Sequence, residues 1–200
     1  MRLLEERIRR EALVVLPDVL RVDMFLNHLI DAELLDEIGA EFARIFADEV
    51  GRITKILTVE ASGIAIACAA ARHFGVPVLF AKKGAGNKTL DKDVYCSSVF
   101  SFTKEAVSTV SVARRFLRPG ERVLVIDDFL ANGAAARGLL DIIDQADAEL
   151  AGIGIVIEKG FQPGGTVLRA QGVRVESLAL IKSMSEGRVT FAESEAALAL

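Results

Sequence analysis

Two kinds of hydrophobic pattern alternate along this chain. Short runs in which most residues are apolar, such as residues 53–59 (ITKILTV) and 122–127 (RVLVID), predict strands that a sheet buries on both faces. Residues 31–49 instead place apolar side chains three or four positions apart, which predicts a helix with Asp31 as its N-cap. The apolar stripe of this helix consists of Leu34, Leu35, Ile38, Phe42 and Ile45.

The same reasoning predicts the other elements. Further helices are expected over residues 2–12, 62–75, 132–147 and 162–172. Further strands are expected over residues 77–82, 94–102, 106–113, 150–159 and 173–181. The segments 94–102 and 106–113 predict an antiparallel pair, and 173–181 is expected to be the last strand. Because strands and helices alternate through the centre, we predict an α/β fold with a mostly parallel central sheet flanked by helices.

Composition narrows the classes of protein to consider. The chain has 200 residues, of which 52% are hydrophobic, so it suits one domain with a sizeable core. A net charge of −4 and the lack of a basic stretch give no reason to expect a nucleic-acid partner. We expect no signal peptide, no membrane span and a cytoplasmic location. Cys68 and Cys96 lack metal-ligand spacing and are expected to be buried thiols.

The strand predicted at 122–127 runs into two adjacent acids, Asp127 and Asp128, and then into a loop of small residues. Ligands of open parallel sheets bind at the carboxyl ends of strands. Small residues let the backbone approach a ligand, and a helix beginning near Asn132 offers free N–H groups to an anion. Carboxylates accept hydrogen bonds from sugar hydroxyls or hold Mg²⁺. The pattern therefore favours a phosphorylated sugar, and the alternative is a strand that ends in two solvated acids.

The segment VLVIDDFLANGAA resembles the signature of the type I phosphoribosyltransferases, which bind phosphoribosyl pyrophosphate (PRPP). The blocks LPDVLRVDMFLNHLID, TVEASGIA, SVFSFTK and GIGIVIEKGFQPG extend the resemblance over nearly the whole chain, to members that act on xanthine. The resemblance implies the type I phosphoribosyltransferase fold. It also implies transfer of the phosphoribosyl group from PRPP to N9 of xanthine, which gives xanthosine 5′-monophosphate (XMP) and pyrophosphate in purine salvage.

The resemblance also implies an organisation and a set of partners. One domain, 1–200, would divide into a hood of about residues 1–35 with part of 160–200, and a core of about residues 36–160. Xanthine and PRPP would be the substrates and a second copy of the chain the partner, in a homodimer. Mg²⁺ would be held mainly by PRPP or pyrophosphate rather than by direct protein ligands.

The PRPP site implied by the resemblance has three parts. Asp127 and Asp128 would face the ribose hydroxyls, and one of them is the candidate base for the purine proton. The 5′-phosphate would be bound by Ala131, Asn132, Gly133, Ala134 and Ala135, and the pyrophosphate by Glu60, Ala61, Ser62, Gly63 and Lys82. Ala135 stands where many relatives have a Ser or Thr, so it offers only its N–H. The residues of 83–93 would form a lid over the site.

Several of these positions also have an ordinary structural interpretation. The TVEASGI segment on its own favours a plain strand-to-helix turn with Ser62 as N-cap, and Lys82 with Lys83 could be a solvated pair. On the base side, the resemblance implies contacts from Leu20, Asn27, Phe129 and Lys159. Phe129 would cover a purine face and Lys159 would donate to a purine carbonyl. Otherwise Leu20 and Phe129 are core residues and Asn27 is a surface amide.

Other functions remain to be separated from this one. A hypoxanthine or guanine phosphoribosyltransferase would use the same chemistry on another base. A non-catalytic regulator that senses PRPP would keep the fold, although this chain has no basic stretch for DNA. A dinucleotide-binding oxidoreductase would need G-x-G-x-x-G directly after a strand, which this sequence lacks. A nucleotide-binding P-loop is also set aside, because the segment GAGNKT does not have the P-loop spacing.

Overall fold

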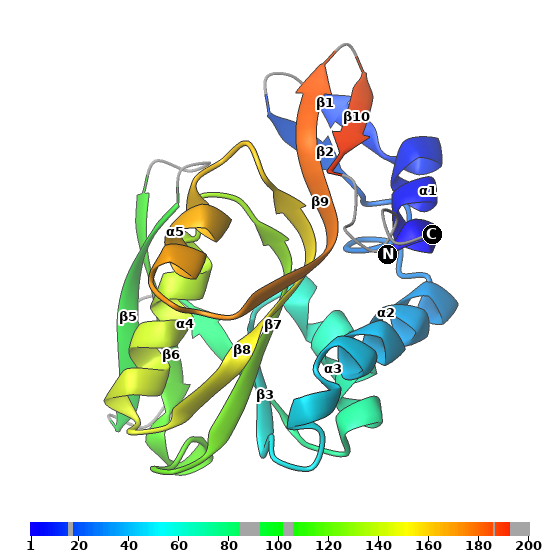
Figure 1. Cartoon of the computed structure of the whole chain (residues 1–200). Coiled ribbons are helices and arrows are strands. Elements are labelled where there is room, and N and C mark those ends of the chain that lie inside the picture. The colour runs from blue at the N-terminus through cyan, green and yellow to red at the C-terminus, as the bar shows by residue number, and fades with distance from the viewer. Residues whose placement is uncertain (16–17, 85–92, 102–105, 186, 193–200) are drawn as a thin grey trace.

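An eight-stranded sheet forms the centre of the computed structural model, which describes residues 1–15, 18–84, 93–101, 106–185 and 187–192. The strand order is β10-β9-β8-β7-β3-β4-β6-β5 (Figure 1). The strands are β3 (Lys55–Val59), β4 (Val78–Lys83), β5 (Val94–Ser101), β6 (Ala106–Ala113), β7 (Arg122–Leu130), β8 (Glu149–Lys159), β9 (Val175–Ser185) and β10 (Arg188–Phe191). The five strands from β9 to β4 run parallel, which confirms the predicted sheet.

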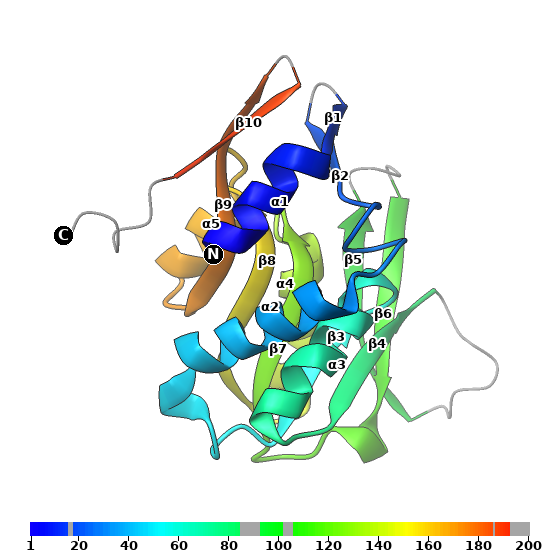
Figure 2. The ribbon, with the colours of Figure 1, turned by 90° about the vertical axis from the view of Figure 1, so that its right-hand side faces the viewer.

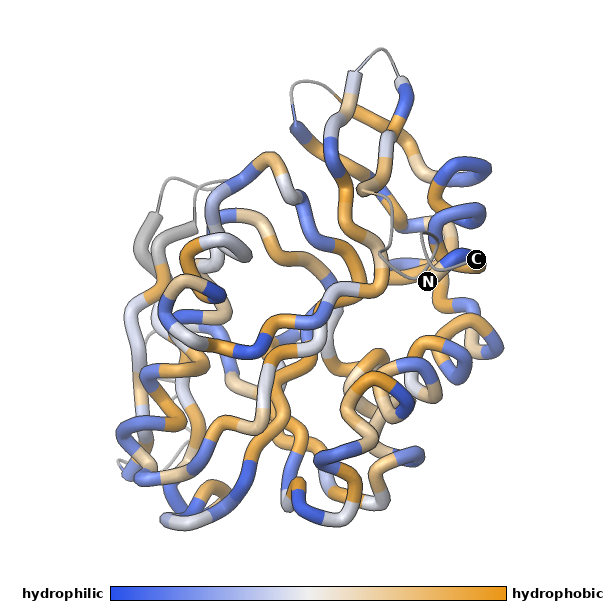
Figure 3. Tube along the Cα trace, viewed as in Figure 1, coloured by the Kyte–Doolittle hydropathy of each residue, from blue (hydrophilic) through white to orange (hydrophobic). Residues whose placement is uncertain are grey.

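Helices cover both faces of this sheet. One face carries α2 (Ala32–Ile45) and α3 (Ser62–Phe74), and the other carries α4 (Ala134–Gln145) and α5 (Gly164–Ala170) (Figures 1 and 2). Successive residues of a strand point to opposite faces, so Leu124 of β7 joins the core under α2 and α3. Its neighbour Val125 joins the core under α4. Burial on both sides explains why the central strands are apolar throughout (Figure 3).

The N-terminal segment lies against the edge of the sheet that β9 and β10 form near the other end of the chain. Helix α1 (Arg2–Glu11) buries Leu4 and Ile8 and is followed by a hairpin of β1 (Leu13–Val15) and β2 (Val19–Arg21). The far end of β9 and its antiparallel partner β10 rise beside them (Figure 2). The prediction that 173–181 is the last strand is therefore wrong. A helix through residue 12 is also one residue too long, because the chain turns into β1. Strands of three or four residues are too short to show a pattern and depend on their partner strands.

The predicted element boundaries hold best where a capping residue marks them. Asp31 Oδ1 accepts the N–H of Leu34 at 3.1 Å, so the N-cap of α2 is confirmed. Helix α3 ends at Phe74, and the φ of 69° at Gly75 suits a glycine C-cap. Helix α2 ends at Ile45, before the predicted residue 49, because a short 3₁₀ turn (Ala47–Glu49) follows it. The antiparallel pairing of β5 with β6 is confirmed as well.

Both cysteines are exposed, and the expectation that they are buried is wrong. Cys68 lies in α3 beside the buried Ala67, on the side of the helix that faces away from the core. Cys96 lies in β5 between the buried Tyr95 and Ser97, so alternation along the strand turns it outward. Buried neighbours in the sequence therefore do not determine which face of the helix or strand each thiol occupies.

The buried ion pair between Glu158 and Arg169 joins β8 to α5. Two hydrogen bonds of 2.7 Å join the guanidinium to the carboxylate, which also accepts from Ser177. Burial opposes ionisation, but the bonds from Arg169 and Ser177 outweigh it and hold the pKa of Glu158 below its usual value. This carboxylate is only 4% exposed, so it depends on its partner.

We expect Arg169→Met to lower the free energy of unfolding by about 2 kcal/mol or more, because it leaves a buried carboxylate unpaired. The loss stays below that of a fully buried pair because the Arg169 side chain is 40% exposed. Urea denaturation followed by circular dichroism measures it. Arg44→Met is the matched control, since it breaks an exposed pair with Glu41, and we expect a change within about 0.5 kcal/mol. Equal losses in the two variants would contradict the role of the buried pair.

Candidate active site at the carboxyl ends of the central strands

Three neighbouring parallel strands bring the predicted polar residues to one edge of the sheet. Strand β7 lies between β3 and β8, so the carboxyl ends of all three meet there. Glu60 directly follows β3, and Lys159 is the last residue of β8. Asp127 and Asp128 lie between them near the end of β7. This is the edge at which open α/β sheets bind ligands.

The two acids lie within β7 rather than after it. The apolar pattern predicts that this strand ends at residue 127, but β8 pairs with β7 as far as Leu130. Alternation therefore separates the acids: Asp127 is 6% exposed, whereas Asp128 is partly open to solvent. Asp127 Oδ1 accepts the N–H of Asp128 at 3.0 Å, and Asp128 Oδ1 accepts the N–H of Phe129 at 3.0 Å. The alternative of two solvated acids at a strand end is wrong for Asp127.

Burial, together with the nearby charge of Asp128, raises the pKa of the Asp127 carboxyl well above its usual range, and the cation of Lys83 offsets this only partly. The carboxyl also lies close to the turn after β3. A Cβ at Gly63 would lie 3.0 Å from Asp127 Oδ1 and 2.1 Å from the Thr58 hydroxyl. Only glycine fits there. Asp127 therefore connects the ribose side of the predicted site with the predicted pyrophosphate loop.

The predicted pyrophosphate loop begins α3. Ala61, not Ser62, occupies the N-cap position, and no side chain caps the helix, so the ordinary interpretation of Ser62 as N-cap is wrong. Glu60 is held between strands: its N–H donates to Ala81 at 3.1 Å and its Oε1 accepts from the backbone of Lys83 at 2.5 Å. Lys82 is the next-to-last residue of β4 and is partly buried. An uncapped helix start beside a lysine is suited to an anion.

The predicted 5′-phosphate loop begins α4. Gly133 has a φ of 77°, which favours glycine, and the helix starts at Ala134 rather than at residue 132. No side chain caps this helix either, so its first N–H groups, Ala134 and Ala135 among them, are left for a ligand. The start of α5 lies against the loop: Gly164 N–H donates to the carbonyl of Ala131 at 3.0 Å. Sequence reasoning missed this support, and the Gly-Gly pair after Pro163 is the only signal for it.

The base-side residues come partly together. Lys159 Nζ lies 6.0 Å from the centre of the Phe129 ring and donates to the backbone oxygen of Asp18 at 2.6 Å. Burial lowers the pKa of Lys159, although the charge of Asp18 opposes the shift. Leu20 is buried in β2, two residues after Asp18. Asn27 is exposed and, within the described part of the chain, makes no side-chain hydrogen bond to the others.

Residues 85–92, most of the predicted lid, lie outside the described residues. The described residues contain no group of three His, Cys, Asp or Glu side chains that could hold a metal ion. Among the helices that the structure describes, none is long and apolar enough to cross a membrane.

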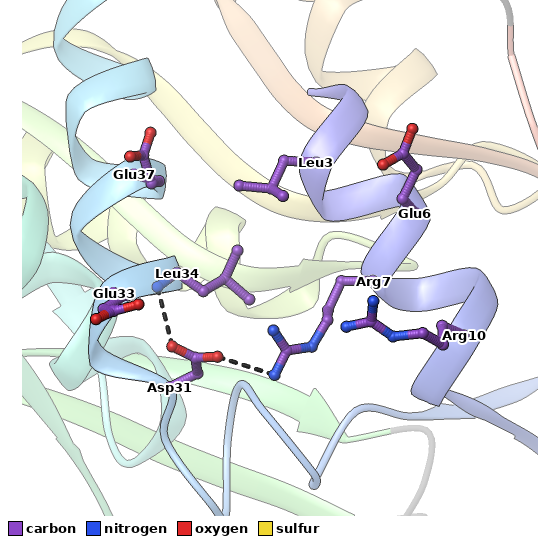
Figure 4. A pocket seen from close by; sticks show the side chains of 8 residues that line it. All are labelled: Leu3, Glu6, Arg7, Arg10, Asp31, Glu33, Leu34 and Glu37. Atoms are coloured by element: carbon purple, nitrogen blue, oxygen red, sulfur yellow. Dashed lines mark hydrogen bonds and ion pairs between the residues drawn. The ribbon is translucent and has the colours of Figure 1, made fainter.

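A separate cavity of about 300 Å³ lies between α1 and α2 and contains none of the predicted site residues (Figure 4). Within its lining Arg7 contacts Asp31 at 2.8 Å, and the same guanidinium contacts Glu11 at 2.8 Å. These pairs fix α1 against the start of α2, because Asp31 is also the N-cap of that helix. We therefore assign this cavity a structural role.

The raised pKa of Asp127 predicts a dependence of stability on pH. The folded chain holds this proton to a higher pH than the unfolded chain, so Asp127 destabilises the fold increasingly as pH rises above about 4. We expect Asp127→Asn to raise the melting temperature at pH 8, by about 2–4 °C for each kcal/mol of unfolding free energy that the variant gains. This gain should shrink toward pH 4. Thermal melts over this pH range test it, with the exposed Asp141→Asn as control. A gain independent of pH would contradict it.

Comparisons with known proteins agree with this geometry. A model of the phosphoribosyl transferase domain matches residues 30–164. A xanthine phosphoribosyltransferase of Ruminiclostridium cellulolyticum is 53% identical over 193 residues, which cover 96% of this chain and 100% of the relative. One from Bacillus cereus is 53% identical over 197 residues, 98% of each chain.

Solved structures share the fold. The adenine phosphoribosyltransferase of Trypanosoma brucei, in complex with AMP, pyrophosphate and ribose-5-phosphate, superposes with a TM-score of 0.76 at 17% identity, over 92% of this chain and 81% of that one. The Giardia lamblia enzyme, with 9-deazaadenine, gives a TM-score of 0.73 at 20% identity, over 88% and 96%. With the family model matching more than half of its length, the chain belongs to the phosphoribosyl transferase domain family.

Proposed function

We propose that the protein transfers the phosphoribosyl group from PRPP to N9 of xanthine, releasing XMP and pyrophosphate. The observation that carries the proposal is the convergence of two uncapped helix starts and an acid pair at one sheet edge. PRPP has a phosphate at each end of a ribose, and this edge offers N–H groups on both sides of two carboxyls. The choice of xanthine as the base follows the names of relatives that share about half of its residues.

The acid pair has the chemistry that the reaction needs. The ribose becomes positively charged as pyrophosphate leaves, and a fixed carboxylate beside it lowers the energy of that state. Asp128, which is partly open to solvent, is the residue for this role and for the ribose hydroxyls. Asp127, buried and with a raised pKa, holds a proton more readily and is the weaker candidate for a negative charge. The N–H groups at the start of α3 would hold the pyrophosphate and those at the start of α4 the 5′-phosphate.

Mg²⁺ is part of this proposal as an ion that enters with PRPP. The carboxylate of Asp128 is an oxygen donor of the kind that Mg²⁺ accepts, and a site with one or two carboxylates suits an ion bound mainly through phosphates. When bound, the ion would neutralise charge on the departing pyrophosphate. The homodimer is also proposed, on the resemblance alone, and the cytoplasmic location stays a prediction from the sequence.

An assay with three labelled bases tests the function. Xanthine, guanine and hypoxanthine compete in one reaction with PRPP and Mg²⁺, and the nucleotides are separated and counted. We expect XMP to dominate. Dominant GMP or IMP would make the protein a guanine or hypoxanthine enzyme. No pyrophosphate release with any base would favour the regulator that only senses PRPP.

A further inference from the structure

Gln162 lies in the turn between β8 and α5, three residues after Lys159. Its backbone N–H donates to the carbonyl of Lys159 at 2.9 Å, which closes the turn. Its side-chain Nε2 donates to Asp18 Oδ2 at 2.8 Å. Lys159 Nζ donates to the backbone oxygen of the same Asp18. Both side chains of the turn therefore contact one residue of the N-terminal segment, on the base side of the predicted site.

The contact with Asp18 fixes the orientation of the Gln162 amide. A carboxylate only accepts hydrogen bonds, so the amide must present its nitrogen to Asp18 and its oxygen elsewhere. That oxygen, Oε1, is buried and has no hydrogen-bond donor among the residues that the structure describes. A buried carbonyl without a donor is unfavourable, and native proteins leave few of them without a reason. A ligand that brings an N–H would complete the site.

We propose that Gln162 Oε1 accepts a ring N–H of the oxopurine base, beside the carbonyl that Lys159 binds; this assignment rests on the proposed function. An oxopurine presents a carbonyl next to an N–H, and the turn offers the complementary pair. Lys159 can only donate, and the fixed Oε1 of Gln162 can only accept. Adenine presents an amino group next to a bare ring nitrogen, which is the reverse pattern. The pair would therefore select oxopurines over adenine, because a mismatch leaves buried polar groups unpaired.

Gln162→Met tests the assignment, because methionine keeps most of the volume and removes the acceptor. We expect kcat/KM for xanthine to fall about 10- to 100-fold, the range for losing a buried hydrogen bond to substrate, with KM for PRPP unchanged within twofold. Asp18→Ala is the matched control, since it removes the same contact with Asp18 but keeps the acceptor. We expect it to lose at least fivefold less. Equal losses in the two variants would reduce Gln162 to a structural contact and overturn the assignment.

A second arm uses the wild-type protein and needs no variant to fold. Methyl groups at N1 or N3 of xanthine block its two six-membered-ring N–H groups, one in each analogue. We expect at least one of the two analogues to inhibit 10-fold more weakly than hypoxanthine does as a competing base. If both analogues inhibited as strongly as hypoxanthine, the assignment would be overturned. The outcomes separate the two proposals. A wild type that forms no XMP refutes the function, whereas XMP formation at equal kcat/KM in wild type and Gln162→Met refutes only the role of Gln162.

Discussion

Asp128→Asn is expected to lower kcat about 10²- to 10³-fold while the fold is retained, which is the scale for removing one preorganised electrostatic group. The substitution keeps the shape of the side chain and its hydrogen bond with the backbone of Phe129, because an amide oxygen can accept as the carboxylate does. What it removes is the negative charge beside the ribose, which matters most when the ribose is positive. The loss should therefore fall on kcat more than on KM for xanthine.

Steady-state kinetics of XMP formation measure this effect, with a thermal melt to show that the variant is folded. Asp141→Asn is the matched control: it removes a carboxylate from an exposed position on α4, and we expect activity within twofold of wild type. Asp127→Asn separates the two acids of the pair. It should raise stability at neutral pH more than Asp128→Asn does, because burial is the larger cause of the raised pKa of Asp127 and the charge of Asp128 the smaller one. A kcat for Asp128→Asn within threefold of wild type would remove this carboxylate from the mechanism.

The sequence predicted the part of the fold that long apolar runs control. The strands at 122–127 and 150–159 and the helix after Asp31 are specified locally, by burial on both faces and by a cap, and all three are present. The end of β7 was missed because it depends on pairing with Ile157 and Glu158 of β8, not on the residues of β7. The longer strand matters for the proposed chemistry, because it buries Asp127 and leaves Asp128 as the more accessible acid.

The support of the site could not be predicted for a related reason. Lys159 and Gln162 meet Asp18 across 141 and 144 positions of the chain, and nothing in the local pattern marks such a contact. Gln162 in a turn is an ordinary solvated residue by sequence alone. Only the structure shows that a carboxylate fixes its amide and that its oxygen is buried. The resemblance implied which residues would touch substrate, but it gave no account of how the N-terminal segment is held against the core.

Gly164 gives the second large expected effect, because the start of α5 supports the 5′-phosphate loop through backbone contacts. A Cβ at this position would lie 2.3 Å from the carbonyl oxygen of Ala131, 2.6 Å from the nitrogen of Gly133 and 2.8 Å from the carbonyl carbon of Asn132. All three are backbone atoms, so a rotamer change cannot relieve the overlap. Gly164→Ala must therefore displace either α5 or the loop, and the loop holds the N–H groups proposed to bind phosphate.

We expect Gly164→Ala to raise KM for PRPP at least 10-fold and to lower the free energy of unfolding by about 1–3 kcal/mol, the usual range for overpacking. Gly165→Ala is the matched control, because its Cβ would lie 1.9 Å from Glu158 Oε1 and so disturb the buried ion pair rather than the loop. We expect Gly165→Ala to lower the free energy of unfolding by a similar amount and to change KM for PRPP much less than Gly164→Ala does. Stability loss alone would affect both variants alike, so a similar KM for PRPP in the two would show that Gly164 does not position the phosphate loop.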